Sequence, residues 1–138
     1  MNPGGASDSP GDLGALPAGV RIAVLLPCYN EAGAIAQTVA EFRTALPQAA
    51  IYVYDNNSSD GSREIAAAAG AIVRQVRQQG KGHVVRRMFA DVDADIYIMA
   101  DGDATYEAAA APAMIGMMLD QNFDMVVGAR RTEVEAAY

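Results

Sequence analysis

The sequence of 138 residues contains no tryptophan, one histidine and one cysteine. The single cysteine, Cys28, excludes an internal disulfide and suits a reducing compartment. No apolar run approaches the roughly 20 residues that a membrane-spanning helix needs. Lysine and arginine number 10 against 17 acidic residues, and the resulting net charge of −7 argues against a nucleic-acid-binding protein, which needs a positive surface. We therefore expect a cytoplasmic protein.

Apolar residues, in contrast, make up 51% of the chain and charged residues 20%, which is typical of a globular domain with a real core. Residues 1–19 differ from the rest because they are rich in Gly, Pro, Ser and Asp. They have neither the basic start nor the apolar run of a signal peptide, so we expect a disordered tail. Residues 20–138 are expected to form one domain.

Short apolar runs alternate with amphipathic segments along the domain. The runs predict strands at residues 21–27, 51–54, 71–76, 95–100 and 123–127. Helical spacing and alanine content predict helices at residues 32–46, 63–69, 83–92 and 109–121. In the third helix, the pattern turns five residues toward the core: Val84, Val85, Met88, Phe89 and Val92. This alternation predicts an α/β, Rossmann-like, mostly parallel sheet with helices on both faces.

Polar segments follow each predicted strand, at residues 29–31, 55–62, 79–82, 101–103 and 128–130. In a parallel sheet the carboxyl ends of the strands lie on one rim, and ligands bind there. The five segments therefore predict a site on that rim.

The segment Asp101-Gly102-Asp103 carries the sharpest chemical signal. Two carboxylates two residues apart repel each other unless a cation lies between them. Their oxygen ligands suit Mg²⁺ or Mn²⁺, and a diphosphate can complete the coordination shell. The alternative is a solvated acidic turn, since Asp and Gly are ordinary turn residues.

The other loops offer groups that fit a nucleotide. Tyr29 can stack on a base, and Glu31 can accept hydrogen bonds from base or ribose; the alternative is a helix start capped by Asn30. Asp55 and Asn56 can read a base edge or ribose; the alternative is an Asx turn. Basic residues gather at Arg74, Arg77, Lys81, Arg86 and Arg87. Among them Lys81, between two glycines, is the phosphate candidate. For Arg86 and Arg87 we favour a solvated helix face, and for the lone His83 a structural role.

Taken in order, the motifs PCYNEA, DNNSSDGS, QGKG, DGDATY and VVGARR resemble those of family 2 glycosyltransferases of the GT-A fold. The dolichol- or polyprenyl-phosphate sugar transferases are the nearest likeness, over residues 21–131. The resemblance implies that residues 20–138 are a nucleotide-sugar-binding half, and it implies a nucleoside group held by Pro27, Tyr29, Glu31, Asp55 and Asn56. It further implies that Asp101, Gly102 and Asp103 hold the diphosphate and the metal, with Asp103 the direct ligand, and that Arg130 reaches the donor.

Two residues depart from that family pattern. Asn56 stands where many members have a second aspartate, which leaves the base preference open. Thr105 stands where some members place a side-chain metal ligand.

The resemblance also implies partners: a nucleoside diphosphate sugar as donor and a polyprenyl phosphate or glycan as acceptor. The acceptor contacts and the catalytic base are expected beyond residue 138, so the chain as given is expected to bind donor without transferring sugar. Contact with a membrane is expected only through the acceptor or through further C-terminal segments.

Two alternatives remain open. The motif Asp101-Gly102-Asp103-Ala104-Thr105 also fits a haloacid-dehalogenase-like phosphatase with Asp101 as nucleophile. A nucleotide-sugar-binding module without catalysis is the other.

Overall fold

The computed structural model describes residues 19–101, 108–121 and 124. Its elements follow in the order β1 (Ile22–Cys28), α1 (Ile35–Ala45), β2 (Ala50–Asp55), α2 (Ser62–Ala68), β3 (Ile72–Gln75), α3 (Lys81–Asp91), β4 (Ile96–Met99), the 3₁₀ turn η3 (Ala108–Ala110) and α4 (Ala111–Gln121). Each predicted strand and helix in this range is confirmed, with ends that shift by a few residues. The strand predicted at residues 123–127 and the tail predicted at residues 1–19, except Gly19, lie outside the described residues.

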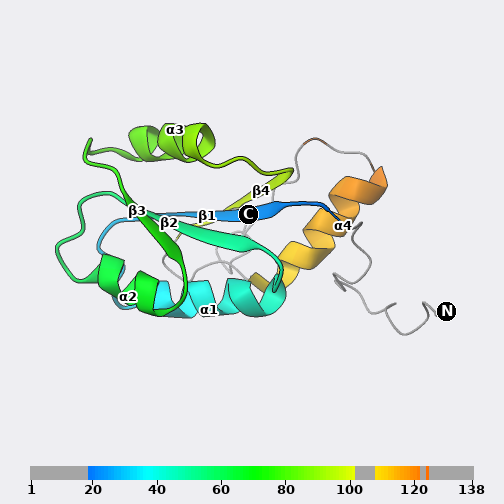
Figure 1. Cartoon of the computed structure of the whole chain (residues 1–138). Coiled ribbons are helices and arrows are strands. Elements are labelled where there is room, and N and C mark those ends of the chain that lie inside the picture. Colours follow the sequence, from blue (N-terminus) through cyan, green and yellow to red (C-terminus); the bar gives the residue numbers. More distant parts are fainter. Residues whose placement is uncertain (1–18, 102–107, 122–123, 125–138) are drawn as a thin grey trace, which may run out of the picture.

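The described strands form a four-stranded sheet in the order β3-β2-β1-β4, and every neighbouring pair is parallel (Figure 1). The chain steps outward from β1 through β2 to β3, then returns to place β4 on the other side of β1. The order therefore reverses between β1 and β4. In open parallel sheets, ligands bind at such a switch point, outside the carboxyl ends of the strands.

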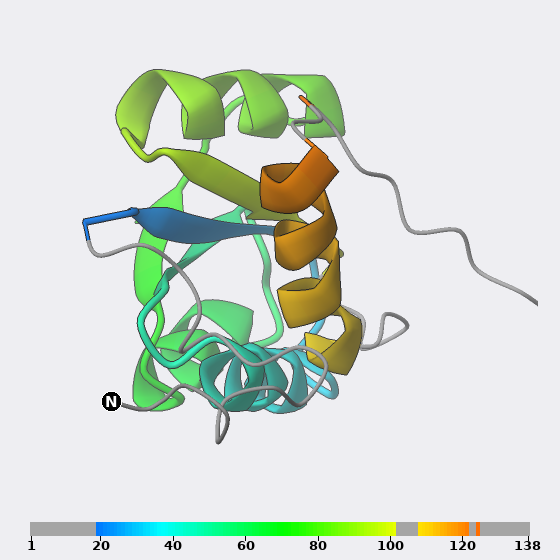
Figure 2. The same cartoon turned by 90° about the vertical axis from the view of Figure 1, so that its right-hand side faces the viewer.

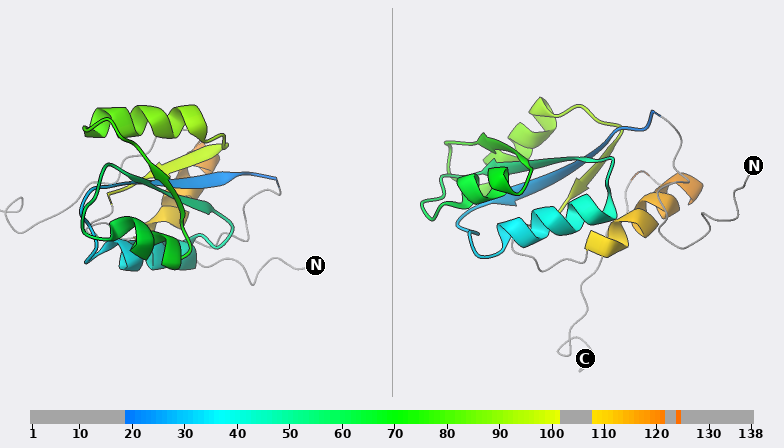
Figure 3. Two further views of the ribbon diagram at one scale, coloured as in Figure 1. Left: turned by 60° about the vertical axis from the view of Figure 1, so that its left-hand side comes forward. Right: turned by 60° about the horizontal axis from the view of Figure 1, so that its bottom comes forward.

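Helices cover both faces of the sheet, as the alternation of elements predicts. Figure 2 shows the sheet between α3 on one side and α1 with α2 on the other, and Figure 3 shows α1 and α2 side by side. All seven residues of β1 are buried, because both of its faces meet helices. Val24 and Leu26 point into the core beneath α1, and Ala23 and Leu25 into the core beneath α3. The continuous apolar run of β1 follows from this double burial.

One detail of the sequence prediction is wrong, and one of its alternatives is excluded. Phe89 does not face the core: it is 47% exposed and packs edge-on against Tyr97, with ring centroids 5.1 Å apart. Asn30 does not cap the first helix, which begins at Ile35 with Ala34 in the capping position and no side-chain cap. No helix in the described part of the chain is long and apolar enough to cross a bilayer.

Candidate functional site

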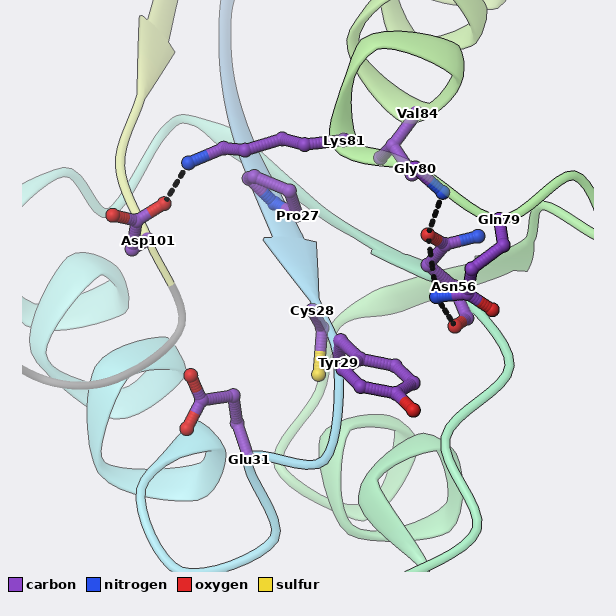
Figure 4. A pocket seen from close by; sticks show the side chains of 10 residues that line it. All are labelled: Pro27, Cys28, Tyr29, Glu31, Asn56, Gln79, Gly80, Lys81, Val84 and Asp101. Atoms are coloured by element: carbon purple, nitrogen blue, oxygen red, sulfur yellow. Dashed lines mark hydrogen bonds and ion pairs between the residues drawn. The ribbon is translucent and has the colours of Figure 1, made fainter.

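A cavity of about 380 Å³ opens at the carboxyl ends of β1 and β4, at the switch point of the sheet (Figure 4). Its walls come from the ends of β1 and β2, from the β3–α3 loop, from α3 and from the end of β4. The lining residues are Pro27, Cys28, Tyr29, Glu31, Asn56, Gln79, Gly80, Lys81, Val84 and Asp101. Parallel pairing thus brings four separate loops of the chain to one place.

The loop after β1 is tied to the loop after β2 by reciprocal hydrogen bonds. The backbone N–H of Asn30 donates to Ser58 Oγ at 2.8 Å, and the N–H of Ser59 donates back to Asn30 Oδ1 at 2.9 Å. The N–H of Glu31 donates to Oγ of the fully buried Ser62 at 2.9 Å. Asn30 takes a left-handed φ of 52°, which Asn tolerates better than most residues. These bonds fix where the backbone carries Glu31 into the cavity.

The loop after β2 is tied in turn to the loop after β3, through the side chain of Asn56. Asn56 Nδ2 donates to the carbonyls of Val76 at 2.9 Å and Gln78 at 2.8 Å. Asn56 Oδ1 accepts from the backbone N–H of Gly80 at 2.9 Å and from Gln79 Nε2 at 3.1 Å. Asn56 is 5% exposed, so these bonds replace water almost completely.

Lys81 and Asp101 face each other across the cavity as an ion pair. Lys81 Nζ lies 2.7 Å from Asp101 Oδ1, with the two side chains 63% and 35% exposed (Figure 4). Lys81 begins α3 and Asp101 follows β4, so the pair bridges the cavity from opposite walls. The carboxylate of Asp101 therefore holds the ammonium group of Lys81 at the switch point of the sheet.

Tyr29 and Glu31 lie on the same wall, just after β1. Tyr29 is 54% exposed, so a face of its ring remains accessible for stacking. The carboxylate of Glu31 is half-buried and lines the cavity between Cys28 and Asp101 in Figure 4. An aromatic surface, a carboxylate and an ion pair thus share one hollow.

Cys28 and Asp55 are paired across β1 and β2 at the base of the site. Burial, and next the charge of Asp55, raise the pKa of the Cys28 thiol to about 11. The Asp55 carboxylate is fully buried, and its Oδ2 accepts from the N–H of Ser58 at 2.9 Å. Among the described residues, Asp55 Oδ1 has no hydrogen-bond partner.

The structure brings together most of the site residues predicted from sequence, namely Pro27, Tyr29, Glu31, Asn56, Lys81 and Asp101. Asp55 lies beneath the cavity and does not line it. Gly102, Asp103, Arg130 and also Thr105 lie outside the described residues. His83, which the sequence assigns a structural role, is absent from the lining.

Sequence reasoning missed the residues that hold the loops together. Three residues of this kind look like ordinary turn residues, namely Ser58, Asp60 and Ser62. Each accepts a hydrogen bond from the loop after β1. Asp60 Oδ2, for example, accepts from the N–H of Ala32 at 3.0 Å. Their only signal in the sequence is the density of short polar side chains in DNNSSDGS.

Among the described residues, no cluster of three or more His, Cys, Asp or Glu forms a metal site. In the cavity, the carboxylate of Asp101 is ion-paired with Lys81. A metal site here therefore requires oxygen ligands besides Asp101.

Comparison with known proteins assigns this arrangement to a family. The model of glycosyl transferase family 2 matches residues 23–136. RfbJ of Shigella flexneri is 56% identical over 111 residues, which cover 80% of this chain and 86% of RfbJ. The dolichyl-phosphate hexose transferase of Haloferax volcanii is 30% identical over 112 residues, covering 81% of this chain and 49% of that protein.

A solved structure has the same fold. Glucosyl-3-phosphoglycerate synthase from Mycobacterium tuberculosis, in complex with Mn²⁺, UDP-glucose and phosphoglyceric acid, superposes with a TM-score of 0.70 at 27% identity. The match covers 86% of this chain and 45% of that one. The chain therefore spans most of RfbJ but about half of the other two proteins.

Proposed function

The chain belongs to glycosyl transferase family 2, and from this premise we propose that its cavity binds the nucleoside diphosphate of a sugar donor in a metal-dependent way. The fold is the GT-A fold expected from the sequence, with a parallel sheet and helices on both faces. The observation that carries the proposal is the meeting of Tyr29, Glu31, Lys81 and Asp101 in one cavity at the switch point.

Each lining residue has a role that its chemistry supports. Tyr29 offers its exposed ring to the base, and Glu31 accepts hydrogen bonds from base or ribose. Lys81 supplies a positive charge for the diphosphate, since an ammonium is a compact partner for phosphate oxygens. Pro27 forms part of the wall, and Asp55 remains a predicted nucleoside contact whose carboxylate lies below the lining.

The residues at the end of β4 would hold the metal. Asp101 would supply one oxygen ligand in place of its ion pair with Lys81, and Asp103 and the donor diphosphate would supply further oxygen ligands of the kind that Mg²⁺ and Mn²⁺ prefer. When bound, the metal would stabilise the charge that develops on the leaving diphosphate. Gly102 would leave room for the diphosphate, and Arg130 would reach its phosphates. The complex of glucosyl-3-phosphoglycerate synthase with Mn²⁺ and UDP-glucose supports this use of a metal.

The reaction that we propose for the whole protein is inverting transfer of a sugar from a nucleoside diphosphate to an acceptor hydroxyl or phosphate oxygen. A polyprenyl phosphate is the leading acceptor, supported by the motif resemblance and by the dolichyl-phosphate hexose transferase among the relatives. The residues described here line a donor site, and we assign no catalytic base among them.

The phosphatase alternative finds no support in these comparisons. Hydrolysis of a generic aryl phosphate that is lost in Asp101→Asn would revive it. A binding module without catalysis keeps the same donor site and differs only in the absence of transfer.

A thermal-shift panel of UDP- and GDP-sugars, with and without Mn²⁺, tests the proposal. A ligand that binds the native state raises the melting temperature according to its excess over Kd. We expect a shift with one base family that is larger with Mn²⁺ than without. A folded protein that no nucleotide shifts at millimolar concentration in Mn²⁺ would refute the donor site.

A further inference from the structure

Asn56 has no hydrogen-bonding capacity left for a ligand. A side-chain amide has two N–H donors and two acceptor lone pairs. In this structure both donors are used by the carbonyls of Val76 and Gln78, and both acceptor positions by Gly80 and Gln79. The two carbonyls on one side and the backbone N–H of Gly80 on the other also fix which end of the amide is nitrogen. Reading a base edge would require Asn56 to break bonds that it already makes while nearly fully buried.

What Asn56 holds is the loop that carries Lys81. Gly80 takes a φ of 128°, which side-chain-bearing residues rarely adopt, and in that conformation its N–H points at Asn56 Oδ1. Lys81 follows directly as the first residue of α3. The position of the Lys81 ammonium in the cavity therefore depends on a bond made one residue earlier.

We propose that Asn56 is a positioning residue for the donor diphosphate: it fixes Gly80 so that Lys81 meets the phosphates, and it does not read the base. This inference rests on the proposed function of the cavity. It also gives a reason for an amide rather than a carboxylate at this position. An aspartate has no N–H to give to Val76 and Gln78, and its charge would lie within about 3 Å of both carbonyl oxygens.

The test compares two ligands that differ only in the diphosphate. Binding of the nucleoside diphosphate that the parent prefers, and of the matching nucleoside, is measured by calorimetry for the parent, Asn56→Asp, Lys81→Met and the double variant. We expect Asn56→Asp and Lys81→Met each to weaken diphosphate binding by roughly tenfold, the usual scale for a charge-assisted contact. Nucleoside binding should change by less than about twofold. The double variant should lose no more diphosphate affinity than the single variant with the larger loss.

Asn57→Asp is the matched control. It makes the same charge change one residue away, in a side chain that donates to Arg77 O at 2.9 Å and to Gln79 Oε1 at 3.0 Å but does not hold Gly80. This variant should show no loss of affinity that is specific to the diphosphate. If Asn56→Asp does not fold, Gly80→Ala replaces it, because it disturbs the same backbone conformation without touching Asn56 and should show the same diphosphate-specific loss.

The outcomes separate the inference from its premise. A parent that binds neither ligand refutes the proposed function, and with it the inference. A parent that binds both, with an equal loss of nucleoside and diphosphate affinity in the Asn56 variant, makes Asn56 a base reader and overturns the inference alone. Additive losses in the double variant would likewise overturn it, because they would separate Asn56 from Lys81.

Discussion

The buried thiol of Cys28 makes the stability of this protein depend on pH in the alkaline range. Its pKa is raised to about 11, from an ordinary value near 9, first by burial and then by the charge of Asp55. The folded state therefore favours the neutral thiol, whereas the unfolded chain ionises at lower pH. The contribution of Cys28 to the free energy of unfolding is therefore fully present below about pH 9 and is lost as the pH rises from about 9 to about 11.

The size of this loss follows from the shift. Each unit of pKa difference corresponds to about 1.4 kcal/mol, so a difference of about two units gives at most about 3 kcal/mol, of which about 2 kcal/mol is lost by about pH 10.5. Cys28→Ala removes this dependence and keeps every other titrating group, including Tyr54, whose pKa is raised to about 12. We therefore expect the stability advantage of the parent over Cys28→Ala to shrink by about 2 kcal/mol between about pH 7.5 and about pH 10.5.

Urea unfolding followed by far-ultraviolet circular dichroism measures this difference, since the chain has no tryptophan. Titration of thiolate absorbance in the native parent gives an independent midpoint. A midpoint near 9, or a parent–variant difference that stays constant with pH, would refute the reasoning.

Three further variants test separate parts of the structure. Lys81→Met removes the ammonium that is ion-paired with Asp101 and that would compete with a metal for this carboxylate. It should raise Mn²⁺ affinity in the absence of nucleotide by roughly two- to fivefold, a small effect because the pair is partly exposed. Paramagnetic resonance measures this affinity, and an unchanged value would contradict the competition. Ser62→Ala leaves the N–H of Glu31 without its acceptor and should cost about 1–3 kcal/mol in urea unfolding, so a cost near zero would contradict the tie between the two loops. Leu26→Ala empties a fully buried position on the central strand and should cost about 2–5 kcal/mol; a near-neutral result would mean that the core relaxes more than its packing indicates.

The fold was predictable because burial on two faces leaves a simple mark in sequence. The apolar run at residues 21–27 is found as β1 (Ile22–Cys28), shifted by one residue at each end. The meeting of Tyr29, Lys81 and Asp101 also follows from sequence, since residues that end parallel strands share one rim. No side-chain geometry is needed for either inference.

Other features depend on partners that sequence does not reveal. Phe89 fits the helical period of its neighbours, but period alone does not tell how far the sheet extends beneath a helix. Among the described strands β4 lies at an edge of the sheet, and Phe89 packs edge-on against Tyr97 there. Asn56 and Asn57 are likewise identical in type, and only the path of the β3–α3 loop decides that Asn56 turns inward to hold Gly80.

The most direct test of the central claim is a calorimetric titration of the preferred nucleoside diphosphate in Mn²⁺ and in EDTA, for the parent and Asp101→Asn. Metal-dependent donor binding predicts tighter binding in Mn²⁺ than in EDTA for the parent. It also predicts that this gain is lost in Asp101→Asn, while the melting temperature without ligand stays near that of the parent. An equal affinity with and without metal in the parent, or the same metal-dependent gain in Asp101→Asn, would contradict the account.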